Sequence, residues 1–266
     1  MIDTEVYLKS VLDRLATLYN SMERAFEGPD FVEVLGQRAF RYSRQTELLA
    51  IFLKGVKVVS ALNASFVLLR DGYTQEMGVL CRVLDDLKNE IIFLLAPLDG
   101  GKYSKDQIEF LRDFFEEELN HPQPIKSTKT RRTTAVRKVH AGVAKVIAKT
   151  LNPSDAQDLF GSLNKAYSGY VHGSYPHIME LYGGTSPITL HFHMKGINDS
   201  HQMDVWRNQF VNYVYRAIPV AVVTARKLGL QEEEQAFTEL LVEFEQKFGF
   251  DPNADPERSM KKMKAT

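Results

Sequence analysis

The densest group of side chains able to bind or react lies in residues 167–177, which read YSGYVHGSYPH. Ser168 and His172 are four residues apart, so a helix would place the hydroxyl and the imidazole one turn from each other. A histidine beside a serine hydroxyl pairs a general base with a nucleophile. Tyr167, Tyr170 and His177 belong to the same segment and are candidate binding residues.

A second polar group follows a helical spacing earlier in the chain. Arg82, Asp86 and Glu90 succeed one another at steps of four, with valines beside them. Charges in apolar surroundings must be paired, because an unpaired buried charge is costly. We expect Arg82 to be a binding residue and Asp86 to orient the imidazole of His172. The alternative is an exposed pair within one helix, worth about 0.3–0.5 kcal/mol.

Ser168, His172 and Asp86 are therefore the catalytic candidates of an incomplete hydrolase site. The Gly-x-Ser-x-Gly elbow that presents a nucleophilic serine between a strand and a helix is absent around Ser168. The structural alternative is a buried His172 that holds two helices together through hydrogen bonds. Both interpretations predict a polar cluster inside a helical protein.

The same residues carry a resemblance to a known family. An Arg-x-x-x-acid pattern on an apolar helix, followed later by Tyr-Ser-x-Tyr-Val-His-Gly, resembles the DUF5677 type of all-helical bacterial proteins. There the pattern is Arg-x-x-x-Glu and then Ser-x-x-Val-His; the matching positions here are Arg82, Asp86, Ser168, Val171 and His172. Asp86 departs from the glutamate. The resemblance covers about residues 50–182 and implies a helical fold with a shared polar cluster, but no reaction.

Two other functions for the histidines are less well matched. Ribonucleases of the HEPN type have four to six residues between an arginine and a histidine, whereas only Lys165 precedes His172 at such a spacing, at its outer limit. Lysine cannot make the bidentate phosphate contact of arginine. His191 and His193 alternate along a predicted strand and form a weak candidate zinc or nickel site. Exposed histidines on a half-buried hairpin would show the same spacing.

A basic stretch offers the one candidate contact with an anion or RNA. Residues 119–154 contain no acid, and Lys138, Lys145 and Lys149 project from the polar side of a predicted helix. No aromatic residues alternate with these charges as binding of a single strand would require. The alternative is a solvated face that balances nearby glutamates.

Composition sets the class of protein. The chain has 266 residues, a formal net charge of −1 and a single cysteine, Cys81. A disulfide within the chain is thus impossible, and Cys81 is expected to be a buried apolar residue. We find no basic and apolar leader and no uninterrupted apolar run of about 20 residues, so the expected location is the cytoplasm. Residues 1–250 are expected to form one helical domain, and residues 251–266 a disordered tail.

Apolar periodicity predicts an all-α fold, an antiparallel helical bundle with a small β-hairpin inserted after His177. One hairpin strand is expected at residues 178–182 and its partner at residues 188–194, where apolar and polar residues alternate. The expected helices cover residues 7–22, 31–70 in one piece, 73–96, 104–119, 136–147, 152–160, 163 onward, 205–228 and 231–248.

These observations lead to two hypotheses of different kinds. The first is a binding or interaction module with a polar cluster, in bacterial defence or the stress response. The second is a hydrolase or a HEPN-like ribonuclease that uses His172. No cofactor is indicated by either, and a homo-oligomer is compatible with both.

Overall fold

The computed structural model describes residues 4–129, 134–147, 153–183, 190–197 and 201–250. The predicted tail and Lys149 lie outside these residues. The helices in chain order are α1 (Thr4–Met22), α2 (Glu47–Arg70), α3 (Thr74–Leu95), α4 (Lys105–Phe115), α5 (Val136–Ile147), α6 (Pro153–His172), α7 (Tyr175–Met179), α8 (His201–Lys227) and α9 (Gln231–Phe248). Short 3-10 turns lie at Glu23–Ala25, Ala96–Asp99 and Pro124–Lys126.

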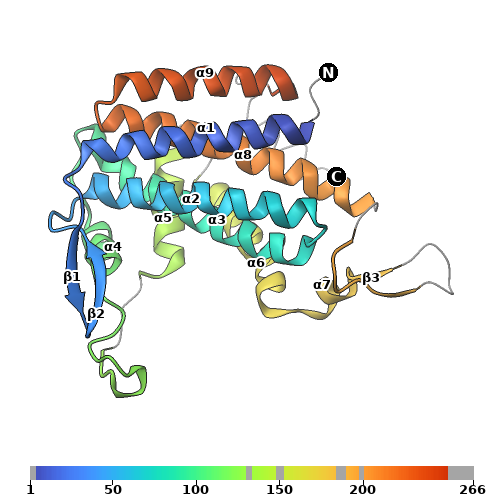
Figure 1. The fold of residues 1–266 in the computed structure, drawn as a ribbon, viewed down its shortest axis with the longest axis horizontal. Helices are drawn as coiled ribbons and strands as arrows, with labels where there is room; N and C mark the ends of the chain where they lie inside the picture. Colours follow the sequence, from blue (N-terminus) through green and yellow to red (C-terminus); the bar gives the residue numbers. More distant parts are fainter. Residues whose placement is uncertain (1–3, 130–133, 148–152, 184–189, 198–200, 251–266) are drawn as a thin grey trace.

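The predicted all-α bundle is confirmed. Helices α1, α2, α8 and α9 run along one another, and α3 packs against α2, α5, α6 and α8 (Figure 1). The core is one apolar cluster whose largest fully buried side chains include Phe210, Phe237 and Phe244. Cys81 belongs to this core, and burial raises the pKa of its thiol to about 12, which confirms its expected role as an apolar residue.

Local signals in the sequence explain where several helices begin and end. Thr46 caps α2 by accepting a hydrogen bond from the backbone N–H of Leu49 at 3.2 Å. Ser104 and Gln107 form the reciprocal capping box of α4. The predicted bounds of α1, α3, α8 and α9 agree with the structure to within a few residues. Helix α6 is continuous, whereas the sequence indicated two pieces.

The single long helix expected over residues 31–70 is wrong. Asp30–Val34 (β1) and Gln37–Arg41 (β2) form an antiparallel hairpin, at the left of Figure 1, and α2 starts only at Glu47. The two-residue turn is Leu35–Gly36, with φ of 51° and 79°, a pair of positive values that suits a tight hairpin. Phe31 faces Phe40 across the strands, with ring centroids 4.7 Å apart.

The hairpin expected after His177 is present but shorter than predicted. Its strands are Tyr182–Gly183 (β3) and His191–Phe192 (β4), paired antiparallel. Ile178 belongs instead to α7, whose start at Ser174-Tyr175-Pro176 suits a helical first turn. The backbone N–H of Ile197 donates to the carbonyl of Gly72 at 2.8 Å, which joins the chain after β4 to the turn between α2 and α3.

Two glycines let neighbouring helices approach α3 closely. The ring of Tyr170 on α6 lies so near Gly78 on α3 that a β-carbon there would meet the ring at 2.6 Å. The ring of Phe93 on α3 likewise fills the space beside Gly142 on α5. Both contacts fix the positions of α5 and α6 against α3.

Helix α2 is long and apolar enough, by length and composition alone, to cross a membrane, which the sequence analysis did not expect. Its most apolar stretch is half buried inside the bundle, and α2 packs against α1, α3 and α8. Core helices of this kind meet the same criterion, so the packing accounts for the composition of α2.

Candidate functional site

Arg82 and Asp86 pair with each other within α3, as in the alternative to the predicted contact between Asp86 and His172. The Arg82 guanidinium donates to the Asp86 carboxylate one turn along the helix, and both side chains are partly buried. With the Asn164 amide turned so that its oxygen faces α3, it accepts from Arg82 Nη2 at 2.5 Å and from Nη1 at 3.1 Å. Arg82 therefore ties α3 to α6. The third member of the predicted stripe, Glu90, pairs elsewhere, with Lys54 at 2.7 Å.

The neighbouring Asp85 is the more deeply buried carboxylate, and sequence reasoning missed it. It is 6% exposed and receives two charge-assisted hydrogen bonds from α8. Tyr213 Oη donates to Oδ2 at 2.8 Å, and Arg216 Nη2 donates to Oδ1 at 2.6 Å. Burial, and then the charge of Asp85, raises the pKa of Tyr213, so this hydroxyl stays a neutral donor. The three residues lock α3 to α8.

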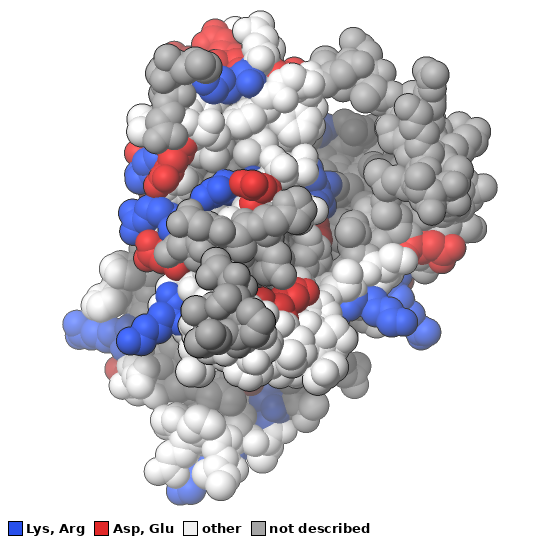
Figure 2. Space-filling model, turned by 90° about the vertical axis from the view of Figure 1, so that its right-hand side faces the viewer, with Lys and Arg blue, Asp and Glu red and all other residues white. Residues whose placement is uncertain are grey.

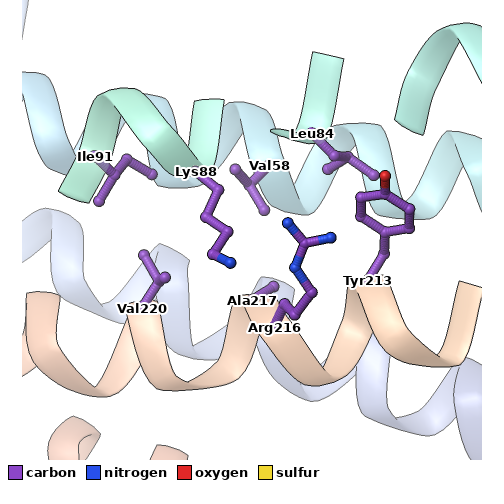
Figure 3. A pocket seen from close by; sticks show the side chains of 8 residues that line it. All are labelled: Val58, Leu84, Lys88, Ile91, Tyr213, Arg216, Ala217 and Val220. Atoms are coloured by element: carbon purple, nitrogen blue, oxygen red, sulfur yellow. The ribbon is translucent and has the colours of Figure 1, made fainter. Parts of the chain in front are cut away.

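Lys88 follows Asp85 by about one turn and enters a cavity between α2, α3 and α8. In Figure 3 its amine and the Arg216 guanidinium reach into the same space from opposite helices. The other walls are largely apolar and include Val58, Leu84, Ile91, Ala217 and Val220. Lys88 makes no hydrogen bond or ion pair with any residue that the structure describes. Burial, and then the nearby charge of Arg216, lowers the pKa of Lys88 to about 8.

A second small cavity is also lined by Arg216. It is enclosed by residues of α3, α5, α6 and α8 that we call the interhelical cluster: Arg82, Asp85, Asn89, His140, Asn164 and Arg216. Asn89 and His140 are each 6% exposed, and neither side chain hydrogen bonds to a described residue. Burial, and then the charge of Arg82, lowers the pKa of His140, which favours the neutral imidazole.

Three predicted binding residues lie beside this cluster without entering it. Tyr167 makes an edge contact with Tyr213, with ring centroids 6.4 Å apart. Tyr170 donates to both oxygens of Glu180, at 2.9 and 3.1 Å, and its ring is 4.1 Å from that of His177. His177 Nδ1 also lies 2.6 Å from Ser174 Oγ. Tyr170 and His177 thus form a separate aromatic group that joins α6 to α7.

The predicted catalytic residues are not joined by hydrogen bonds in the part of the chain that the structure describes. Asp86 binds Arg82, and no hydrogen bond or ion pair between these two described residues joins Asp86 to His172. His172 is exposed at the end of α6, so the alternative of a buried histidine between two helices does not hold either. Ser168 is half-buried on the preceding turn of α6.

Replacing His172 with alanine is expected to change the free energy of unfolding by less than about 0.5 kcal/mol, because an exposed side chain without partners contributes little. The matched control is His140→Ala, which removes a buried ring whose centroid lies 5.6 Å from that of Phe160. We expect this variant to lose about 2 kcal/mol of the free energy of unfolding. Urea denaturation of both variants measures the difference. A larger loss for the His172 variant would contradict the placement of this residue.

Among the residues that the structure describes, no further ligands complete the candidate metal site at His191 and His193. The two rings lie 4.2 Å apart, and His193 Nε2 is 2.9 Å from the carbonyl oxygen of Gly183. Over the described ranges of the chain, no group of three or more His, Cys, Asp or Glu side chains is arranged to hold a metal ion. The pair on its own does not make a structural zinc site, which takes four ligands.

The basic residues of α5 contact acids or solvent. Lys138 pairs with Asp106 of α4 at 2.6 Å, and Lys145 is exposed. Figure 2 shows one face of the molecule, on which the described lysines and arginines lie interspersed with aspartates and glutamates. The pairing of Lys138 and the exposure of Lys145 agree with a solvated face, and the predicted contact with an anion or RNA through these lysines stays a prediction.

Comparisons with family models, with curated proteins and with solved structures found no match to this chain. The resemblance to the DUF5677 type therefore stays a prediction. The proposal of a function therefore depends on the geometry of the site.

Six residues of the site could not be recognised from the sequence: Asp85, Lys88, Asn89, His140, Tyr213 and Arg216. The one available signal was the spacing of Tyr213 and Arg216, three residues apart on a largely apolar stretch of α8.

Proposed function

We propose that this chain is a binding module that takes up a small anion in the cavity between Lys88 and Arg216. The observation that carries the proposal is a surplus of positive charge inside an apolar-walled cavity. Lys88 and Arg216 supply two positive charges, and Asp85 is the one carboxylate among the described residues whose charge acts on Lys88. Asp85 is already engaged by Tyr213 and Arg216.

An anion would relieve a real energetic cost. Two partly buried cations that line one cavity lose hydration and repel each other, and burial, followed by the charge of Arg216, lowers the pKa of Lys88. An anion between them replaces the lost hydration with charge-assisted hydrogen bonds. The binding energy therefore comes from a cationic group, the Lys88 ammonium, that already lies in the cavity and makes no hydrogen bond to a described residue.

Rigid support for the cavity favours binding over catalysis. Arg216 is held by Asp85 and lies 5.0 Å from the ring centroid of Tyr213, so its guanidinium is oriented before a ligand arrives. No hydrogen bond assembles Ser168, His172 and Asp86, and we therefore place the hydrolase and ribonuclease alternatives second. A role in bacterial defence or the stress response remains part of the proposal.

Thermal unfolding in different salts tests the proposal. When potassium chloride or potassium formate replaces potassium gluconate at constant ionic strength and pH 7, at least one of the two small anions should raise the wild-type Tm, because a ligand bound only by the folded chain stabilises it. At ten times its Kd the gain is about 1.4 kcal/mol.

Variants of two lysines separate a bound anion from general salt effects. The response should disappear in Lys88→Met and persist in Lys57→Met, which removes an exposed lysine of α2. Equal responses in the two variants would refute the proposed site, since salt would then act without the cavity.

A further inference from the structure

We infer that the anion held between Lys88 and Arg216 is a single halide ion, which in cells means chloride. This inference rests on the proposed function and adds the identity of the ligand. It is drawn from three properties of the cavity: its size, the charge it must balance and the chemistry of its walls. Together they argue against anions with several heavy atoms and against divalent anions.

The size of the cavity admits one small species. Its volume is about 20 Å³, compared with the roughly 10–15 Å³ that a cavity needs to hold one water molecule. A halide is close to water in size and fits this space. Acetate, phosphate and the carboxylate ends of metabolites have several heavy atoms and would require α2, α3 or α8 to move.

The charge around the cavity matches a monovalent anion. Lys88 and Arg216 contribute two positive charges and Asp85 one negative charge. Arg82, the next cation along α3, is balanced by Asp86. One negative charge therefore neutralises the local surplus, whereas a divalent sulfate or phosphate would leave an uncompensated charge in an apolar surrounding.

The walls supply few donors, which suits an ion without directional acceptor sites. The Tyr213 hydroxyl and one Arg216 nitrogen are occupied by Asp85, so the donors left are the Lys88 ammonium and the remaining guanidinium N–H groups. Val58, Ile91 and Val220 offer only aliphatic hydrogens (Figure 3). A phosphate would leave oxygen atoms without partners against these side chains, whereas a halide accepts from whichever donors are present.

The line width of the chloride NMR signal tests the inference directly. Chloride that exchanges between bulk water and a protein site gives a broader signal than free chloride. At pH 7 the wild-type protein and Lys57→Met should broaden the signal, and added bromide should sharpen it by competition. In Lys88→Met the excess width should fall to the level of the protein-free buffer.

The outcomes separate this inference from the proposed function. Formate could stabilise the wild type through Lys88 while chloride neither stabilises the protein nor gives a broadened NMR signal. The site then binds an anion that is not a halide, and only the inference fails. If neither anion acts through Lys88, both the inference and the proposed function fail. Broadening that is equal in wild type and Lys88→Met overturns the inference, because that chloride is bound elsewhere.

Discussion

Replacing Asp85 with alanine is expected to lower the free energy of unfolding by about 3–5 kcal/mol, one of the largest effects of any polar substitution in this protein. Asp85 is 6% exposed and accepts hydrogen bonds from both Tyr213 and Arg216. Without the carboxylate, the partly buried Arg216 guanidinium is left beside Lys88 without the counter-charge of Asp85, and α3 loses this polar connection to α8.

The matched control is Asp86→Ala, one residue further along the same helix. The Asp86 side chain is 33% exposed and its partner Arg82 keeps a second acceptor in Asn164, so we expect a loss of about 1 kcal/mol or less. Urea denaturation at pH 7 gives both values, with similar m-values if the two variants unfold in one cooperative step. Equal losses would show that the buried network of Asp85 does not stabilise the fold more than a half-exposed pair.

Replacing Lys88 with methionine is expected to raise the free energy of unfolding by about 1–3 kcal/mol at pH 7 in potassium gluconate, because an apolar side chain of similar length replaces a poorly solvated charge. The gain should be smaller in potassium chloride, where the bound anion stabilises the wild type but not the variant. Thermal and urea denaturation in the two salts measure this gain in the free energy of unfolding.

The pH dependence of this gain follows from the pKa of Lys88, which is about 8 in the folded protein and has an ordinary value of 10.5. Between these values the unfolded chain binds more protons than the folded one, so wild-type stability rises with pH. The cost of the charged amine is fully present below pH 8 and is lost as the pH approaches 10.5. The advantage of Lys88→Met should therefore disappear over this window.

The helices could be predicted from the sequence because their signals are local. Apolar spacings of three and four define α1, α3 and α9, and residues such as Ser104 mark a helix start through contacts within one turn. The β1–β2 hairpin was missed because Leu35-Gly36 is not one of the common turn pairs that identify a two-residue hairpin. A run without proline reads as helix unless such a turn is recognised.

The candidate site was harder to predict because it depends on how helices are rotated against one another. Asp85 and Asp86 are adjacent in sequence but about 100° apart around α3. Only the position of α8, whose Tyr213 lies 128 residues from Asp85, determines which of the two is buried. The stripe of Arg82 and Asp86 was recognised from its spacing, whereas Lys88 and His140 have no local pattern that distinguishes them from surface residues.

The contact between Gly78 and the ring of Tyr170 has a consequence for how this sequence can diverge. Any β-carbon at position 78 would meet the ring at 2.6 Å, so the two positions cannot change independently. A homologous chain with alanine or serine at position 78 should carry a smaller side chain at position 170, or its α6 should be displaced from α3. Paired substitution at these positions, 92 residues apart, is thus a coevolution signal that the packing predicts.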